Sequence, residues 1–163
     1  MSEQSFRITG YKDKVSMYEM FLRQYAALIE GETDLISIMA NTAAALKEAF
    51  NFFWVGFYLV KNEQLIIGPF QGSIACYRIK KGKGVCGTAW AEEKTLVVPD
   101  VDLFPGHIAC SSLSRSEIVV PLIKEKEIIG VLDIDSDKPA DFDETDRIYL
   151  EKTMKLMMQT QII

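Results

Sequence analysis

The first fifty residues carry a hydrophobic pattern with the period of an α-helix. Between Lys14 and Ile29, apolar side chains recur at spacings of three and four: Val15, Tyr18, Phe21, Leu22, Tyr25, Leu28 and Ile29. This spacing places them on one face of an amphipathic helix. Thr33 or Asp34 can cap a second helix, which carries on one face Leu35, Ile38, Met39, Leu46 and Ala49.

Beyond Asn51 the pattern changes to the alternation and the β-branched composition of strands. We expect strands at 54–60, 64–68, 95–98, 117–123 and 127–136, and a weaker one at 73–79. A short helix is expected near 85–92, after a glycine-punctuated loop. The last helix starts at the cap Asp143-Glu144-Thr145-Asp146, and its apolar stripe includes Ile148, Leu150, Met154, Met157 and Met158.

Hairpin strands between terminal helices predict an α+β domain with a mainly antiparallel central sheet. The helical flanks 14–50 and 143–160 would cover one face of this sheet. The segment 101–116 has no period, and such long irregular segments in compact domains are often functional. This segment and the short helix would together form a lid over the other face. The sheet and the site would then lie within residues 51–136. No linker divides the chain, and we expect one domain over 1–163.

Composition and charge exclude several classes of protein. A hydrophobic share of 48% and a charged share of 25% are typical of a globular chain and not of a disordered one. The net charge of −5 lacks the positive field that supplies most nucleic-acid affinity. No run of about 18 apolar residues is present, and the first residues show no apolar secretion signal. We therefore expect a cytoplasmic protein that binds neither nucleic acid nor membrane.

Three cysteines are the first candidates for chemistry: Cys76, Cys86 and Cys110. An odd number in a cytosolic chain argues against a disulfide framework, so each thiol is buried and inert, bound to metal, or used chemically. Cys110 ends an irregular loop where a thiol can form the reactive thiolate, although hydrophobic packing is an equal alternative. Cys76 lies in the weaker strand, where burial is the commoner outcome. Cys86 begins the short helix, where the helix dipole and Lys83 would lower its pKa.

A Cys3His zinc site is a second use of these thiols, with His107 as the fourth ligand. The spacing argues against it, because only His107 and Cys110 lie close in sequence. We therefore expect no metal.

Carboxylates form a second group of candidates. Asp133 and Asp135 point to the same face of their strand, because side chains alternate along a strand. Glu117 opens the preceding strand and would lie near Asp135 if the two strands form a hairpin. Like charges held close raise at least one pKa, which keeps a proton available. The alternative is that Glu117 and Asp135 lie at solvated strand ends.

Aromatic residues on the first strand are candidates for a pocket wall. Trp54 lies on the same face as Gly56 and Tyr58, and the glycine leaves room beside the two rings. Such a wall suits an apolar or cationic group of a ligand. Ordinary core packing is the commoner role of a tryptophan in this position.

Four stretches taken together carry a resemblance to a known family. They are residues 51–58, ACYRIKKGKGVCGTA at 75–89, VPDVDLFPGHIACSSLSRSEIVVPLI at 98–123, and GVLDIDS at 130–136 followed by Phe142-Asp143. Over roughly 51–146 the chain resembles the free methionine-(R)-sulfoxide reductases, which are single GAF domains. Each motif alone is weak, but their co-occurrence with three cysteines is specific.

The resemblance implies a role for each cysteine. Cys110 occupies the position of the nucleophile. Cys76 occupies the position that resolves the intermediate by forming a disulfide with the nucleophile. Cys86 matches the third family cysteine, whose candidate role is that of a secondary recycling thiol. The family also suggests a homodimer.

The resemblance likewise implies a substrate site. Glu117, Asp133 and Asp135 match the acidic residues that hold the ammonium and sulfoxide groups of free methionine-(R)-sulfoxide. Trp54 matches the aromatic wall against the substrate methyl group, and Tyr58 shares its face.

The chemistry of the residues agrees with this resemblance. Sulfoxide reduction needs a soft nucleophile to attack sulfur and an acid to protonate oxygen, and a thiolate with a carboxylic acid of raised pKa supplies both. The sulfenic acid formed would be converted to a disulfide, which a thioredoxin-like dithiol reopens. No metal, nucleotide or flavin cofactor is implied. The alternative function is a non-catalytic GAF module that senses a small ligand or redox state.

Overall fold

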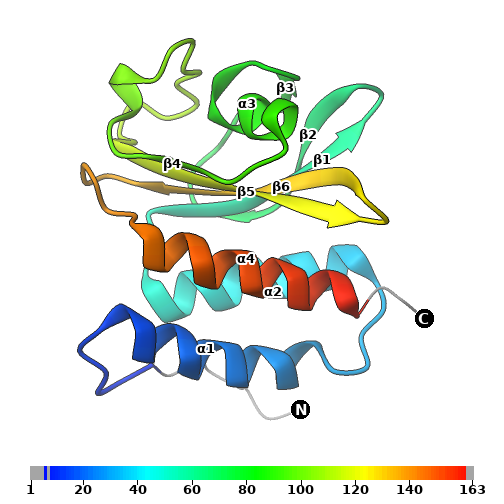
Figure 1. The fold of residues 1–163 in the computed structure, drawn as a ribbon, viewed down its shortest axis with the longest axis vertical. Coiled ribbons are helices and arrows are strands. Elements are labelled where there is room, and N and C mark those ends of the chain that lie inside the picture. Colours follow the sequence, from blue (N-terminus) through cyan, green and yellow to red (C-terminus); the bar gives the residue numbers. More distant parts are fainter. Residues whose placement is uncertain (1–5, 7, 161–163) are drawn as a thin grey trace.

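The chain forms a six-stranded antiparallel sheet with helices on both faces (Figure 1). The computed structural model describes residue 6 and residues 8–160. Its helices are α1 (Lys14–Ile29), α2 (Leu35–Phe50), α3 (Gly84–Glu92), the 3-10 turn η1 (Val101–Leu103) and α4 (Glu144–Gln159). Its strands are β1 (Trp54–Lys61), β2 (Gln64–Gln71), β3 (Arg78–Lys80), β4 (Leu96–Val98), β5 (Ser116–Lys124) and β6 (Glu127–Ser136).

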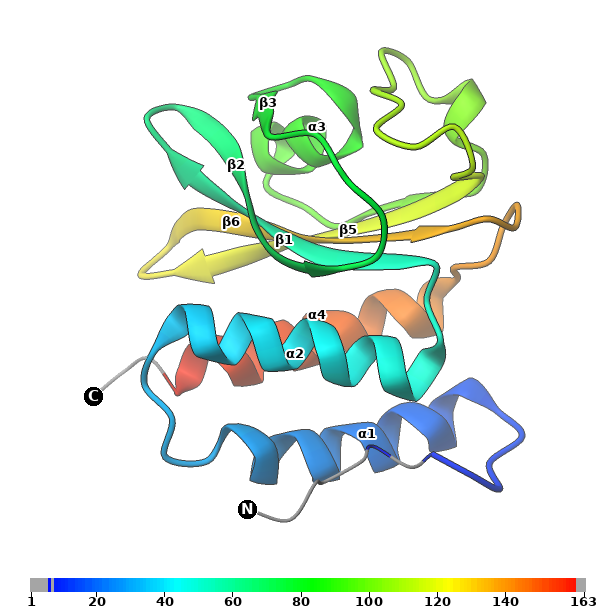
Figure 2. The same cartoon turned by 180° about the vertical axis from the view of Figure 1, so that it is seen from behind.

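The sheet has the strand order β3-β2-β1-β6-β5-β4, and every neighbouring pair is antiparallel. Helices α2 and α4 lie against one face, and α1 packs on these two helices from outside (Figure 2). The other face carries α3 and the irregular segment between β4 and β5. The α+β prediction is confirmed, as is the lid of short helix and loop. The difference is that α1 forms a second helical layer beneath α2 and α4.

Local sequence explains where the first two helices begin and end. The side chains of Asp13 and Asp34 accept hydrogen bonds from the backbone N–H groups of Ser16 and Ser37, as N-caps do. Asn51 ends α2 in the left-handed conformation, with φ of 53°. The predicted positions of both helices are therefore confirmed. No helix in the described part of the chain is long and apolar enough to cross a bilayer.

Alternation along the strands divides the buried residues into two groups. Val55 and Phe57 face the helical layers and belong to the main core, whereas Trp54 and Tyr58 face α3. The predicted burial of the helical stripes is wrong for two residues. Val15 and Ile148 are 43% and 38% exposed, because each lies on the solvent side of its helix, beside the buried stripe.

The strand predicted at 73–79 is wrong for most of its length. The chain leaves the sheet at Gly72, whose φ is 142° and where a Cβ atom would lie 2.4 Å from Trp54 Cδ1. The indole Nε1 of Trp54 donates a hydrogen bond to the Ser73 carbonyl oxygen at 2.9 Å. The chain returns to the sheet at β3 (Arg78–Lys80), which pairs with the edge of β2. Cys76 therefore lies in a loop that wraps around the edge of Trp54.

A buried carboxylate joins the first helix to the last. Asp146 is 3% exposed and accepts hydrogen bonds from the Tyr18 hydroxyl at 2.8 Å and from Lys14 Nζ. It also accepts the Asp143 backbone N–H at 2.8 Å, which completes a capping box at the start of α4. The position of α1 against α4 depends on this contact.

We predict that Asp146→Ala lowers the free energy of unfolding by about 2–4 kcal/mol, because it removes three hydrogen bonds and leaves the Tyr18 hydroxyl buried without a partner. Urea denaturation measures this loss. The exposed Asp137 provides a matched control, and Asp137→Ala should stay within about 0.5 kcal/mol of the wild type. Equal stability of the two variants would contradict the role assigned to Asp146.

Candidate active site

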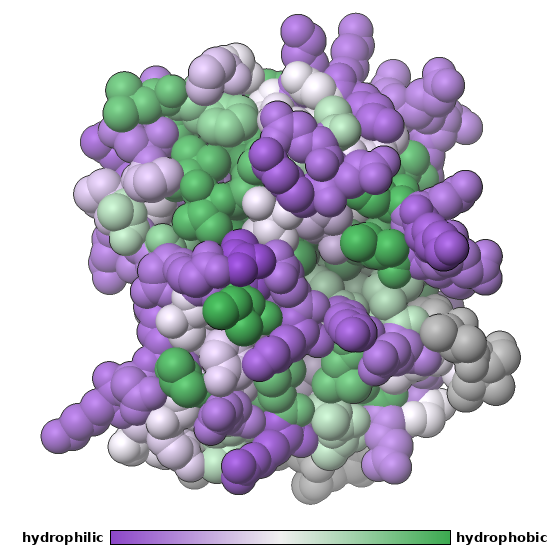
Figure 3. Space-filling view, in the orientation of Figure 1, coloured by the Kyte–Doolittle hydropathy of each residue, from purple (hydrophilic) through white to green (hydrophobic). Residues whose placement is uncertain are grey.

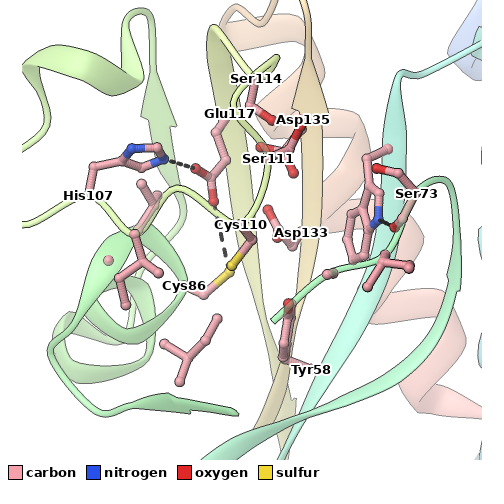
Figure 4. Close-up of a pocket in the computed structure, with 17 residues that line it drawn as sticks. Tyr58, Ser73, Cys86, His107, Cys110, Ser111, Ser114, Glu117, Asp133 and Asp135 are labelled. Carbon is pink, nitrogen blue, oxygen red and sulfur yellow. Dashed lines mark hydrogen bonds and ion pairs between the residues drawn. The ribbon is translucent and has the colours of Figure 1, made fainter. Parts of the chain in front are cut away.

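A narrow cavity lies between the sheet and the lid, on the face away from the long helices (Figure 4). Strands, α3 and two loops contribute its lining: Trp54, Tyr58, Ser73, Ile74, Ala75, Ile79, Gly84, Val85, Cys86, His107, Ile108, Cys110, Ser111, Ser114, Glu117, Asp133 and Asp135. Seven of the eight residues predicted for the site are among them. The eighth, Cys76, is bonded to Cys110.

Strand pairing brings the three predicted carboxylates together. Glu117 on β5 lies opposite Asp135 on β6, and Asp133 lies two residues away on the same face of β6. Glu117 is 5% exposed and Asp133 is 7% exposed, while Asp135 is half-buried. The expected proximity is confirmed. The alternative that Glu117 lies at a solvated strand end is wrong, because α3 and the lid cover it.

Burial controls the protonation of these carboxylates. Loss of water raises the pKa of Asp133 to about 6. Burial, followed by the nearby charge of Asp133, raises the pKa of Glu117 and of Asp135 well above the ordinary range. In the described part of the chain, no lysine or arginine forms an ion pair with any of the three. At least one carboxyl group therefore keeps its proton near neutral pH.

Among the described residues, His107 is the basic side chain within ion-pair distance of this cluster. Its Nε2 lies 3.9 Å from Glu117 Oε2, and its imidazole comes from the lid. Burial lowers the pKa of His107, so the ring is neutral at pH 7 and leaves the carboxylates without a compensating charge. The sequence singled out His107 only as a zinc ligand and gave no sign of Ser114, which also lines the cavity.

One acceptor in the cavity has no partner. Asp133 Oδ1 is buried and receives no hydrogen bond from any described residue. Leaving such an acceptor unsatisfied costs about 1–3 kcal/mol. A ligand that brings a charged donor recovers this free energy, so the cavity is suited to an ammonium group.

The position of Cys86 contradicts the expected lowering of its pKa. Cys86 is 3% exposed, and its Sγ lies 3.9 Å from Glu117 Oε1. Burial, together with the charges of Asp133 and Glu117, raises the pKa of Cys86 well above its ordinary value. Lys83 is exposed at the N-cap of α3 and the thiol points toward the carboxylates, so desolvation outweighs the helix dipole.

A disulfide joins the other two cysteines. Cys76 and Cys110 are 34 residues apart in sequence, and their Cα atoms lie 5.4 Å apart. The bond ties the loop after Gly72 to the lid. The Cys3His arrangement is not assembled, because two of its thiols are consumed in this bond. The described residues instead bring together a different set of metal-ligating atoms, from Cys86, Glu117 and Asp133.

The aromatic wall is present but is packed more closely than expected. Trp54 stacks on Tyr58 and on Phe70, with ring centroids 6.3 Å and 5.3 Å apart. The space beside Gly56 is filled, because a Cβ atom there would lie 2.3 Å from Phe70 Cβ. Trp54 is therefore both a packed core residue and part of the wall of the cavity.

The surface of the lid differs from that of the helical layers. Figure 3 shows hydrophobic side chains gathered at the upper left of the molecule, where Figure 1 places the segment that follows β4. Leu103 and Leu113 of this segment are 80% and 63% exposed. Other apolar side chains of the same segment anchor it, because Val101 is 1% exposed and Phe104 packs against the buried residues beneath α3.

The raised pKa of Asp133 predicts how stability depends on pH. Asp133 has a pKa of about 6 in the folded protein and about 3.9 in an unfolded chain. Between these values the folded state binds more protons, so its contribution to the free energy of unfolding falls as pH rises. Asp133→Asn removes the free-energy cost of ionising this buried carboxyl group. It should therefore stabilise the fold at pH 7 by roughly 1–3 kcal/mol. Urea denaturation from pH 4 to 7, with Asp137→Asn as control, measures this; destabilisation by Asp133→Asn at pH 7 would refute it.

Comparison with known proteins agrees with this geometry. The GAF domain model matches residues 34–160. GAF domain-containing protein A of Dictyostelium discoideum is 63% identical over 145 residues, 88% of this chain and 92% of that protein. Free methionine-R-sulfoxide reductase of Escherichia coli is 50% identical over 125 residues, 76% of each chain. The structure of free methionine-R-sulfoxide reductase from Neisseria meningitidis in complex with its substrate has a TM-score of 0.93 and 51% identity, covering 97% of this chain and 96% of that one. The chain therefore belongs to the GAF domain family and, within it, to the free methionine-R-sulfoxide reductases.

Proposed function

We propose that this chain reduces free methionine-(R)-sulfoxide to methionine, with Cys110 as the nucleophile. The observation that carries the proposal is one cavity in which Cys110, disulfide-bonded to Cys76, lies beside the carboxylates of Glu117, Asp133 and Asp135. The relatives named as reductases support it. The preference for the R epimer is taken from these relatives.

The first step transfers oxygen from the substrate to the enzyme. The Cys110 thiolate attacks the sulfoxide sulfur, and a protonated carboxyl group delivers its proton to the sulfoxide oxygen. The hydroxyl group then passes from the substrate sulfur to Cys110 Sγ, and both the S–O bond and the S–S bond formed in the attack break. Methionine leaves with its lone pair restored, and Cys110 becomes a sulfenic acid. Glu117 and Asp135 are suited to the acid role, because their raised pKa keeps a proton available near neutral pH.

The second step restores the thiols. Cys76 attacks the sulfenic acid, a disulfide forms and water is released. A thioredoxin-like dithiol protein, with a potential of about −270 mV, then supplies two electrons and two protons. The Cys76–Cys110 bond is the product that this sequence of steps requires. Buried Cys86, with its raised pKa, is less suited to nucleophilic attack and instead presents its S–H to Glu117.

The cavity also accounts for the substrate class. The ammonium group of a free amino acid can donate to Asp133 Oδ1 and balance the neighbouring carboxylates. A methionine inside a peptide lacks this group. Trp54 provides an apolar surface for the substrate methyl group.

The disulfide form leaves little room for a substrate. The cavity has a volume of about 40 Å³, enough for roughly three water molecules. A molecule of methionine sulfoxide is larger, so the lid must move before it binds. Reduction of the Cys76–Cys110 bond releases the lid from the loop after Gly72 and permits this motion.

The decisive experiment offers the reduced protein free R-sulfoxide, free S-sulfoxide and peptide-bound sulfoxide in an assay coupled to thioredoxin. We expect consumption of the free R epimer and a loss of at least about 10³-fold in Cys110→Ser, because the attacking sulfur is gone. Binding of the sulfoxide without turnover would support the sensor alternative. Full activity of Cys110→Ser would exclude the thiol mechanism.

A single-turnover burst of methionine would identify the resolving role of Cys76. Reduced Cys76→Ser should release about one methionine per chain in a burst, because attack on the sulfoxide does not need the resolving thiol. Turnover with thioredoxin should then fall at least about tenfold. Quenched-flow measurement of methionine checks both, with Cys86→Ser as the matched thiol control. Unchanged steady-state turnover of Cys76→Ser would refute the resolving role.

A further inference from the structure

One end of the cavity brings together a thiol and two carboxylates. The ligand atoms of Cys86, Glu117 and Asp133 all lie within 4.8 Å of one another, and each residue is buried. They come from three elements, α3, β5 and β6, so the fold and not a local motif places them side by side. From this arrangement we propose a binding site for a thiol-seeking divalent cation such as Zn²⁺, at which the metal excludes the substrate.

The geometry is close to that of a bound zinc ion. Zinc–sulfur bonds of about 2.3 Å and zinc–oxygen bonds of about 2.0–2.2 Å in a tetrahedral site place sulfur and oxygen about 3.5 Å apart. Cys86 Sγ and Glu117 Oε1 are 3.9 Å apart. Small side-chain rotations are therefore enough to bring the three ligand atoms around one ion.

A second, independent observation points to a cation. Asp133 is 7% exposed and its Oδ1 has no hydrogen-bond partner. Within the described residues, no lysine or arginine pairs with the carboxylates. A metal ion would satisfy the lone oxygen and balance the charge in one step.

The donor set selects the class of metal. A thiolate favours zinc and other late divalent ions, whereas magnesium and calcium prefer an all-oxygen shell. On binding, the S–H bond of Cys86 breaks, the sulfur electron pair forms the bond to the metal, and the proton passes to water. No electron is transferred. The fourth position faces the cavity, where water or the neutral imidazole of His107 can fill it.

Inhibition follows from the shared ligand. The metal and the substrate ammonium group both require Asp133, so they compete. This consequence rests on the proposed function, whereas metal binding itself does not. Zinc should therefore raise the apparent KM for the sulfoxide, and a chelator should reverse the effect.

Cobalt provides a direct test of binding, because a thiolate–cobalt bond has a charge-transfer absorption. In the oxidised protein Cys76 and Cys110 are bonded, so Cys86 is the one free thiol. Titration of this form with Co²⁺ should show the absorption with a stoichiometry of one ion per chain. Cys86→Ser should abolish it, and Asp133→Asn should weaken the affinity at least about tenfold. The exposed Asp137→Asn serves as control and should match the wild type.

The outcomes separate this proposal from the proposed function. Absence of the absorption, or an affinity that Asp133→Asn leaves unchanged, would overturn the metal site even if the reductase is active. If the reductase activity is absent, the cobalt titration still decides whether the site exists. In an active enzyme, zinc inhibition that is not competitive with the sulfoxide would overturn the exclusion of substrate. Circular dichroism of each variant shows whether the fold is retained.

Discussion

The pairing of β5 with β6 determines where the charged groups of the cavity lie. Glu117 opposes Asp135, and Asp133 follows on the same face. Because side chains alternate along a strand, a register shift of one residue would turn these carboxylates into the apolar core beneath α2 and α4. The alternating apolar residues of the same strands, such as Ile118 and Ile134, fill that core and so hold the register.

Holding three carboxylates under a lid is costly, and the described structure supplies no cation to offset the cost. Burial raises the pKa of each carboxyl group, and one oxygen of Asp133 is left without a partner. Such groups are usually paired in proteins. Their arrangement here is explained by a ligand that brings a positive charge and a group that needs a proton. In the proposed mechanism, this loss of stability provides an acid beside the nucleophile Cys110.

The disulfide links this electrostatic site to the lid. Cys110 is carried by the irregular segment between β4 and β5, and Cys76 by the loop that wraps around Trp54. Neither loop is held by the regular hydrogen bonds of a sheet, so each can move while the carboxylates stay fixed on their strands. In the proposed function, the carboxylates on the strands bind the substrate and the two cysteines on the loops carry out the redox recycling.

The sequence by itself determined where the helices and strands lie and which side chains share a face, because helix caps and the period of apolar residues are local. It placed α1, α2 and α4, the paired carboxylates of β6, and Trp54 beside Tyr58. Tertiary structure alone decided the burial of Cys86 and the place of His107, since both depend on the packing of α3 and the lid. It also took Cys76 out of its expected strand, through the contact between Gly72 and the indole of Trp54. The pKa of a thiol and the path of a loop depend on contacts between distant residues, which no local pattern in the sequence records.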